Sequence, residues 1–137
     1  MPRTRRSRAE AEVRITRIWA DEVGTSHFAD IDIDLETTDY APPAPPFEVS
    51  APFPAEQAML FEFPAGWFGD WHPSPRRQLY FNLGGQLEAE VGDGETRRLG
   101  PGDIVLLEDL TGTGHVTRVI GDAPSSGVFV QLRPEQP

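Results

Sequence analysis

The stretch that decides the fold is residues 66–85, GWFGDWHPSPRRQLYFNLGG. Its short segments 70–74 and 78–83 have the composition and length of strands, and its Gly84-Gly85 pair is typical of a hairpin turn. Two strands followed at once by a third favour an antiparallel β-sheet here.

Working outward, the same alternation of apolar and polar residues recurs along most of the chain, with no helical period and no internal repeat. The expected strands are residues 13–19, 27–35, 58–63, 70–74, 78–83, 86–91, 102–108, 114–120 and 128–132. Short strands at this spacing predict an all-β fold, a small antiparallel β-barrel or jelly roll.

The chain has 137 residues, which suits a single domain, and we expect it over residues 13–137 after a disordered basic tail at 1–12. Residues 40–55 contain six prolines together with Phe47 and Phe53. Proline blocks ladder hydrogen bonds, so this segment is expected to be an ordered arm, either a lid over a pocket or a strap at a subunit contact.

Composition excludes several classes of function. The net charge is −10 even though four arginines lie in the first eight residues, so the body repels nucleic acid. Cysteine and lysine are both absent, which rules out disulfides, thiolate chemistry and Schiff bases. No apolar run could span a membrane and no leader pattern is present, so we expect no membrane partner and a cytoplasmic location.

The spacing in residues 66–85 carries a family resemblance. Gly66 is followed by five residues, His72-x-Ser74, three residues, Gln78, six residues and Gly85. With the later stretch from Gly102 to His115, this pattern resembles the cupin superfamily, and in particular small single-domain cupins with WHP, RRQ and EDxTGxGH signatures. The resemblance implies a double-stranded β-helix and a homodimer.

The metal ligands that the family uses are only partly present. Where cupins have His, His, Glu and His, this chain has His72, Ser74, Gln78 and His115. A hydroxyl and a neutral amide are poor ligands for divalent iron, manganese, nickel or zinc. We therefore expect no cofactor, while a degenerate site built from His72, Gln78 and His115 stays as an alternative.

Alternation also predicts which side chains share an interior pocket. If His72 points inward, the other inward polar residues are Ser74, Gln78, Tyr80, Asn82, His115 and Thr117. Several polar groups aimed into an apolar core are costly unless something polar binds there. The sequence thus predicts a pocket for a small organic molecule.

We assign candidate roles by chemistry. The catalytic candidates are His72, His115, Tyr80 and Glu108, which can transfer protons. The substrate-binding candidates are Trp71, Ser74, Arg76, Gln78, Asn82 and Thr117. Three functions stay open: an isomerase, cyclase or lyase using histidine acid–base chemistry, a metal-dependent oxygenase, and a non-catalytic binding or sensing module.

Overall fold

The computed structural model describes residues 12–135, and this part of the chain consists of ten strands without a helix. The strands are β1 (Glu12–Ala20), β2 (Ser26–Thr38), β3 (Phe47–Ser50), β4 (Ala55–Phe63), β5 (Gln78–Gly84), β6 (Gln86–Glu90), β7 (Thr96–Leu99), β8 (Ile104–Glu108), β9 (Val116–Ile120) and β10 (Ser125–Leu132). No helix in the described residues could therefore cross a membrane.

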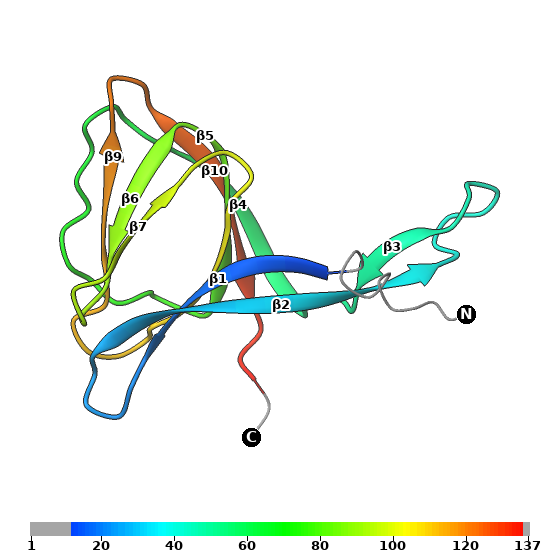
Figure 1. Cartoon of the computed structure of the whole chain (residues 1–137), viewed down its shortest axis with the longest axis horizontal. Coiled ribbons are helices and arrows are strands. Elements are labelled where there is room, and N and C mark those ends of the chain that lie inside the picture. Colours follow the sequence, from blue (N-terminus) through cyan, green and yellow to red (C-terminus); the bar gives the residue numbers. More distant parts are fainter. Residues whose placement is uncertain (1–11, 136–137) are drawn as a thin grey trace.

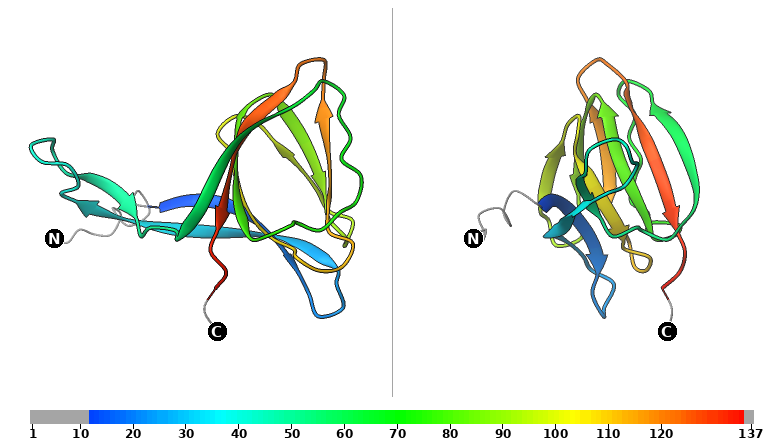
Figure 2. Two further views of the ribbon diagram at one scale, coloured as in Figure 1. Left: turned by 180° about the vertical axis from the view of Figure 1, so that it is seen from behind. Right: turned by 90° about the vertical axis from the view of Figure 1, so that its right-hand side faces the viewer.

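The strands form two separate sheets that face each other (Figures 1 and 2). The larger sheet has the order β3-β2-β1-β8-β5-β10-β4, and the smaller sheet has the order β7-β6-β9. Only β1 and β8 pair in parallel among the named strands. The all-β jelly roll is thus confirmed, but the sheets do not close into a continuous barrel, because no ladder joins β4 or β3 to the smaller sheet.

Alternation along the strands divides the apolar residues between two clusters. On β8, Val105 and Leu107 face the core between the sheets, whereas Leu106 packs in a second cluster on the other side of the larger sheet. On β5, Tyr80 likewise faces the core between the sheets, and Leu79 packs in the second cluster. The space between the sheets is therefore walled on both sides by apolar side chains.

Most expected strands are present, with differences at three places. Residues 70–74 form no strand and make a single bridge, from His72 to His115, because Pro73 interrupts the segment. Strands β3 and β7 were not predicted, since each is only four residues long. Glu12 already belongs to β1, whereas residues 1–11 of the predicted tail lie outside the described residues.

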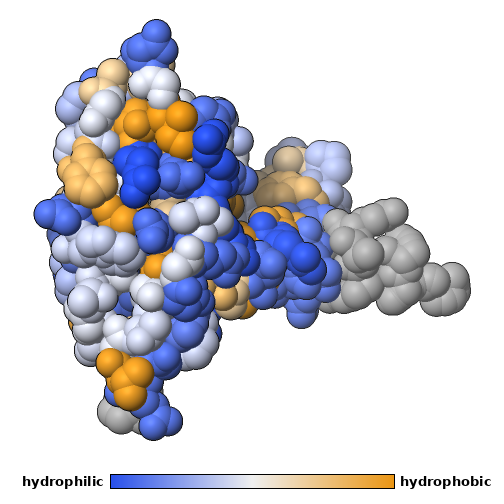
Figure 3. All heavy atoms as spheres, turned by 60° about the vertical axis from the view of Figure 1, so that its left-hand side comes forward, coloured by the Kyte–Doolittle hydropathy of each residue, from blue (hydrophilic) through white to orange (hydrophobic). Residues whose placement is uncertain are grey.

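The proline-rich segment extends away from the two facing sheets as part of a hairpin between β2 and β3 (Figures 1 and 3). Phe53 of this segment packs against the outer apolar cluster. Phe47 remains 45% exposed beside Tyr40. The segment contributes no residue to the interior cavity, so it is not a lid over that cavity.

Candidate active site

A cavity of about 320 Å³ lies between the two sheets. Its floor is apolar and includes the fully buried Ile18 and Leu87. Its exposed lining residues, Met59, His72 and Pro75, mark the mouth. A cavity of this size, lined mainly by apolar side chains with a few polar groups, is typical of a small-molecule site.

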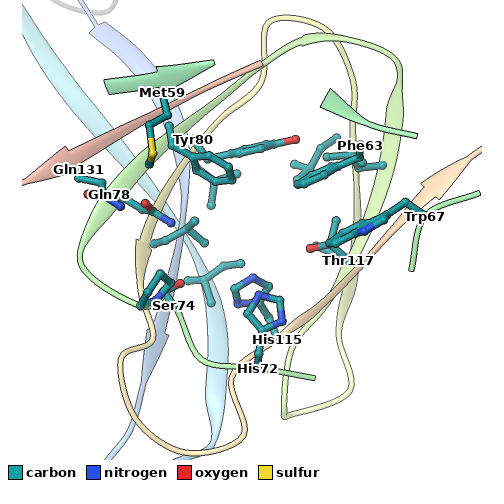
Figure 4. Close-up of a pocket in the computed structure, with 18 residues that line it drawn as sticks. Met59, Phe63, Trp67, His72, Ser74, Gln78, Tyr80, His115, Thr117 and Gln131 are labelled. Carbon is teal, nitrogen blue, oxygen red and sulfur yellow. The ribbon is translucent and has the colours of Figure 1, made fainter. Parts of the chain in front are cut away.

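Six of the residues predicted to share a pocket do line this cavity (Figure 4). They are His72, Ser74, Gln78, Tyr80, His115 and Thr117. The alternation argument therefore places these six side chains correctly, and Arg118, next to Thr117, pairs with Glu88 instead.

The two histidines lie side by side, although 42 residues separate them in the sequence (Figure 4). Their backbones exchange two hydrogen bonds, His72 N to His115 O at 3.1 Å and His115 N to His72 O at 3.0 Å. Gly114 permits this approach, since a Cβ there would lie 1.9 Å from the carbonyl oxygen of His72. Gly114 also has φ +76°, which disfavours any side chain.

His115 is held by a buried carboxylate. Its Nδ1 lies 2.6 Å from Oδ2 of Asp109, a fully buried residue. Ser74 donates its hydroxyl to the other carboxylate oxygen at 2.7 Å and its backbone N–H to the Asp109 carbonyl at 2.9 Å. Asp109 thus fixes the His115 ring and connects it to the segment that carries His72.

His72 is oriented by backbone instead. Its Nδ1 lies 2.9 Å from the carbonyl oxygen of Asp70. Asp70 has φ 55°, an unusual value for a residue with a side chain, and its carboxylate accepts a hydrogen bond from Trp71 N. This turn directs the carbonyl at the ring.

The hydrogen bonds define which ring nitrogens can act in the cavity. Carboxylate and carbonyl oxygens accept hydrogen bonds, so both neutral rings carry their proton on Nδ1. Nε2 of His72 and Nε2 of His115 are then unprotonated. Each can accept a proton or a hydrogen bond from a molecule in the cavity.

Gln78 and Tyr80 occupy the opposite part of the wall (Figure 4). Gln78 is only 5% exposed, and its amide has no hydrogen-bond partner among residues 12–135. The Tyr80 hydroxyl donates to Asn82 Oδ1 at 3.3 Å, and burial raises the pKa of this phenol. Tyr80 therefore stays protonated at neutral pH and is unsuited to act as a base.

Four predicted site residues lie outside the cavity. Glu108 lies on the outer face of β8 between Arg17 at 2.5 Å and Arg77 at 2.6 Å. Burial raises the pKa of Glu108, but the hydrogen bonds from these two guanidinium groups outweigh it and hold the pKa below its usual value. A carboxylate paired in this way is not a base for the cavity.

The remaining three have structural or surface positions. Arg76 forms an ion pair with Glu56 and does not reach the cavity. Trp71 is 42% exposed. Asn82 is fully buried. Its side-chain nitrogen donates a hydrogen bond to Gly85 O, and its side-chain oxygen accepts one from the Ser125 hydroxyl, so Asn82 connects the end of β5 to the start of β10.

Asp109 is the candidate functional residue that the sequence assignment left out when it selected its neighbour Glu108. The signal was available in the alternation, because Val105 and Leu107 face inward and Asp109 is two residues further on. Several wall residues were also missed because they come from distant strands: Met59 and Phe63 from β4, and Phe129 and Gln131 from β10.

The donor set does not fit a transition metal. Two imidazole nitrogens are available, but the Ser74 hydroxyl is bonded to Asp109, and both oxygens of Asp109 are already used. Gln78 would supply only a neutral amide. In the described part of the chain no cluster of three or more His, Cys, Asp or Glu residues is placed to hold a metal ion.

Among solved structures, the cupin domain of Cnp3 supports this fold. The cupin domain of Cnp3 from Schizosaccharomyces pombe superposes with a TM-score of 0.50 and 14% identity, covering 90% of this chain and 85% of that domain. A protein of unknown function from Streptococcus pyogenes, SPY1581, gives a TM-score of 0.43 at 22% identity, covering 58% of this chain and 65% of its own. No family model matches the sequence.

In sequence, the chain is similar to the dimethylsulfoniopropionate lyase DddQ of Ruegeria pomeroyi. The two are 38% identical over 61 residues, which is 44% of this chain but only 29% of that lyase. The similarity thus concerns a segment of the lyase and not its whole length.

The two facing sheets and the likeness to the Cnp3 cupin domain show that this chain has a cupin-like fold. The resemblance that residues 66–85 indicate is confirmed at this level.

Proposed function

We propose that the chain is a small-molecule lyase of the cupin type in which His115 is the general base. The observation that carries this proposal is the His115–Asp109 pair, with an Nδ1–Oδ2 distance of 2.6 Å and Nε2 free at the cavity. A buried carboxylate behind an imidazole holds the ring in one tautomer and stabilises it once it takes up a proton. The segment similar to a curated lyase supports the same class of reaction.

The reaction we propose is an elimination from a carbonyl compound. His115 Nε2 removes a proton from the carbon next to the carbonyl group, and that electron pair forms a carbon–carbon double bond. The bond from the next carbon to the leaving group breaks, and the leaving group departs with its electrons. An unsaturated carbonyl compound and the protonated leaving group result.

His72 has the position of the second proton carrier. It lies at the mouth, beside His115 and open to solvent, with ring centroids 5.0 Å apart. After elimination the proton that His115 Nε2 has taken up passes to the leaving group, directly or through His72 Nε2 or water, and His115 returns to its neutral form. Isomerisation would begin with the same proton abstraction and end with return of the proton to another carbon.

The test is a screen for elimination followed by NMR, which detects the vinyl protons of the product. Dimethylsulfoniopropionate and neutral ketones with a thioether or hydroxyl group on the β-carbon are incubated with purified protein. We expect at least one of these compounds to be consumed, with no loss of rate after EDTA treatment.

One tightly bound metal per chain, lost together with turnover on chelation, would favour the metal-dependent oxygenase or a metal lyase instead. Binding without turnover of any compound would favour a binding module.

A further inference from the structure

We infer that the cavity takes an uncharged, flat and mainly apolar carbonyl compound, and that the Gln78 amide selects it by donating a hydrogen bond to the carbonyl oxygen. This inference rests on the proposed function for the choice of a carbonyl group, because the proton that His115 would remove lies next to one. It goes further by specifying the charge, size and anchoring residue of the substrate.

The volume sets the size of the molecule. The cavity measures about 320 Å³. A buried apolar cavity of about 150 Å³ holds one benzene molecule. The present cavity therefore has room for roughly twice that, which corresponds to two fused rings or one substituted ring.

The walls set its shape and polarity. Phe63 and Trp67 stack with ring centroids 4.2 Å apart and an interplanar angle of 3°, and both line the cavity. Gly69 lies close against the Trp67 ring, since a Cβ there would be 2.5 Å from it. Phe129 and Tyr80 add further aromatic surface. Rings fixed in this way favour a flat apolar partner.

The charges around the cavity argue against an anion. None of the described arginines lines the cavity, and the sequence has no lysine. The nearest carboxylate is Asp109, behind His115, and it offsets any positive charge that the ring acquires. A carboxylate or phosphate would lose its water here without gaining a guanidinium partner, which is costly.

Gln78 is a buried polar group of the cavity wall whose side chain lacks a hydrogen-bond partner in the described residues. Only 5% of Gln78 is exposed to solvent. Its side chain points into the cavity (Figure 4), and its amide makes no hydrogen bond within residues 12–135. Ser74 and Tyr80 already donate their hydroxyls to Asp109 and Asn82. A buried amide left unpaired is unfavourable, so a ligand that accepts a hydrogen bond from it gains more than one that does not.

The experiment compares three probes of one shape: 2-acetylnaphthalene, 2-naphthoate and naphthalene. Each is titrated into ¹⁵N-labelled full-length protein at pH 8, and dissociation constants are taken from NMR shifts of cavity groups such as the Trp67 indole N–H. We expect the neutral ketone to bind about tenfold more tightly than the carboxylate and several-fold more tightly than naphthalene. Gln78→Leu should remove the advantage over naphthalene. Gln86→Leu, at an exposed glutamine outside the cavity, should keep it.

Three results would overturn the inference. These are a carboxylate that binds as tightly as the ketone, a ketone preference that survives Gln78→Leu, and no shift of cavity resonances with any of the three probes. The titrations involve no turnover, so they are independent of the proposed lyase activity. If the ketone binds as expected and no compound is ever eliminated, the proposed function fails while the binding class stands.

Discussion

Asp109 and Glu108 are neighbours in the sequence, yet they lie on opposite faces of the larger sheet. Glu108 pairs with two arginines outside, and Asp109 accepts hydrogen bonds from Ser74 and His115 inside. One step along the chain, from the last residue of β8 to the next, therefore separates the ion pairs of Glu108 from a carboxylate that orients the His115 ring.

We expect Asp109→Asn to lower turnover by about 10²–10⁴-fold, because an amide no longer stabilises the protonated ring. Glu108→Gln is the matched control at the adjacent position, and its turnover should stay near that of the wild type. Rates of elimination of both variants are measured at saturating substrate, after circular dichroism has checked the fold. Equal losses in the two variants would contradict the role given to Asp109.

His27 provides a prediction of pH dependence far from the cavity. Its Nε2 lies 2.8 Å from Asp21 and its Nδ1 2.8 Å from Asp93, and these hydrogen bonds raise the pKa of His27, that to Asp21 most. The protonated ring therefore stabilises the fold below its usual pKa of about 6.5, and this contribution disappears as pH rises through the raised value. The melting temperature of His27→Gln should fall further below wild type at pH 5.5 than at pH 9. A constant difference would show that the ion pairs contribute nothing.

At the residue scale, the sequence predicted which polar groups meet but not all their roles. Spacing and alternation were enough to predict that His72, Ser74, Gln78 and His115 line one cavity. Asp109 was underestimated since its importance comes from a contact with His115 that a sequence does not display.

At the scale of elements, the contact between the segment at residues 70–74 and the start of β9 brings the histidines together. Gly114→Ala should place a Cβ against the His72 carbonyl and destabilise the protein by about 1–3 kcal/mol in urea unfolding. Gly94→Ala has a comparable positive φ, but its Cβ would meet nothing within 4 Å. Gly94→Ala should therefore lower the free energy of unfolding clearly less than Gly114→Ala does. Equal losses in the two variants would mean that backbone strain alone, and not the contact with His72, explains the effect.

Element prediction was reliable for long alternating strands and poor for short ones. Strand β3 lies within the proline-rich segment, and it forms because Phe47–Ser50 pairs with the end of β2. Strand β7 depends in the same way on pairing with β6. Such strands are stabilised by their partners, so local sequence carries little signal for them.

At the scale of the whole molecule, the hairpin of β2 and β3 suggests how two copies could meet. The hairpin projects from the sandwich (Figure 1). On it, Tyr40 is 68% and Phe47 45% exposed. An isolated two-stranded hairpin is only marginally stable in water. We therefore keep the homodimer as a prediction. Light scattering after gel filtration should give twice the chain mass of 15.2 kDa, and a monomer at micromolar concentration would contradict it.

The fold as a whole was predictable because turn residues and alternation specify antiparallel strands, and the spacing of residues 66–85 specifies the family resemblance. Whether the two sheets close into one continuous barrel was not predictable from the sequence. Whether the two sheets join depends on hydrogen bonds at their edges, between strands far apart in the sequence. The same long-range pairing decides the cavity volume.

The central claim, that His115 transfers a proton in this cavity, is tested most directly by the turnover of His115→Gln. Elimination rate and ligand dissociation constant are measured side by side by NMR on the wild type and the variant. The account predicts that turnover falls by about 10²-fold or more while affinity changes only a few-fold, because glutamine can hydrogen-bond but does not titrate near neutral pH. Unchanged turnover in His115→Gln would contradict it.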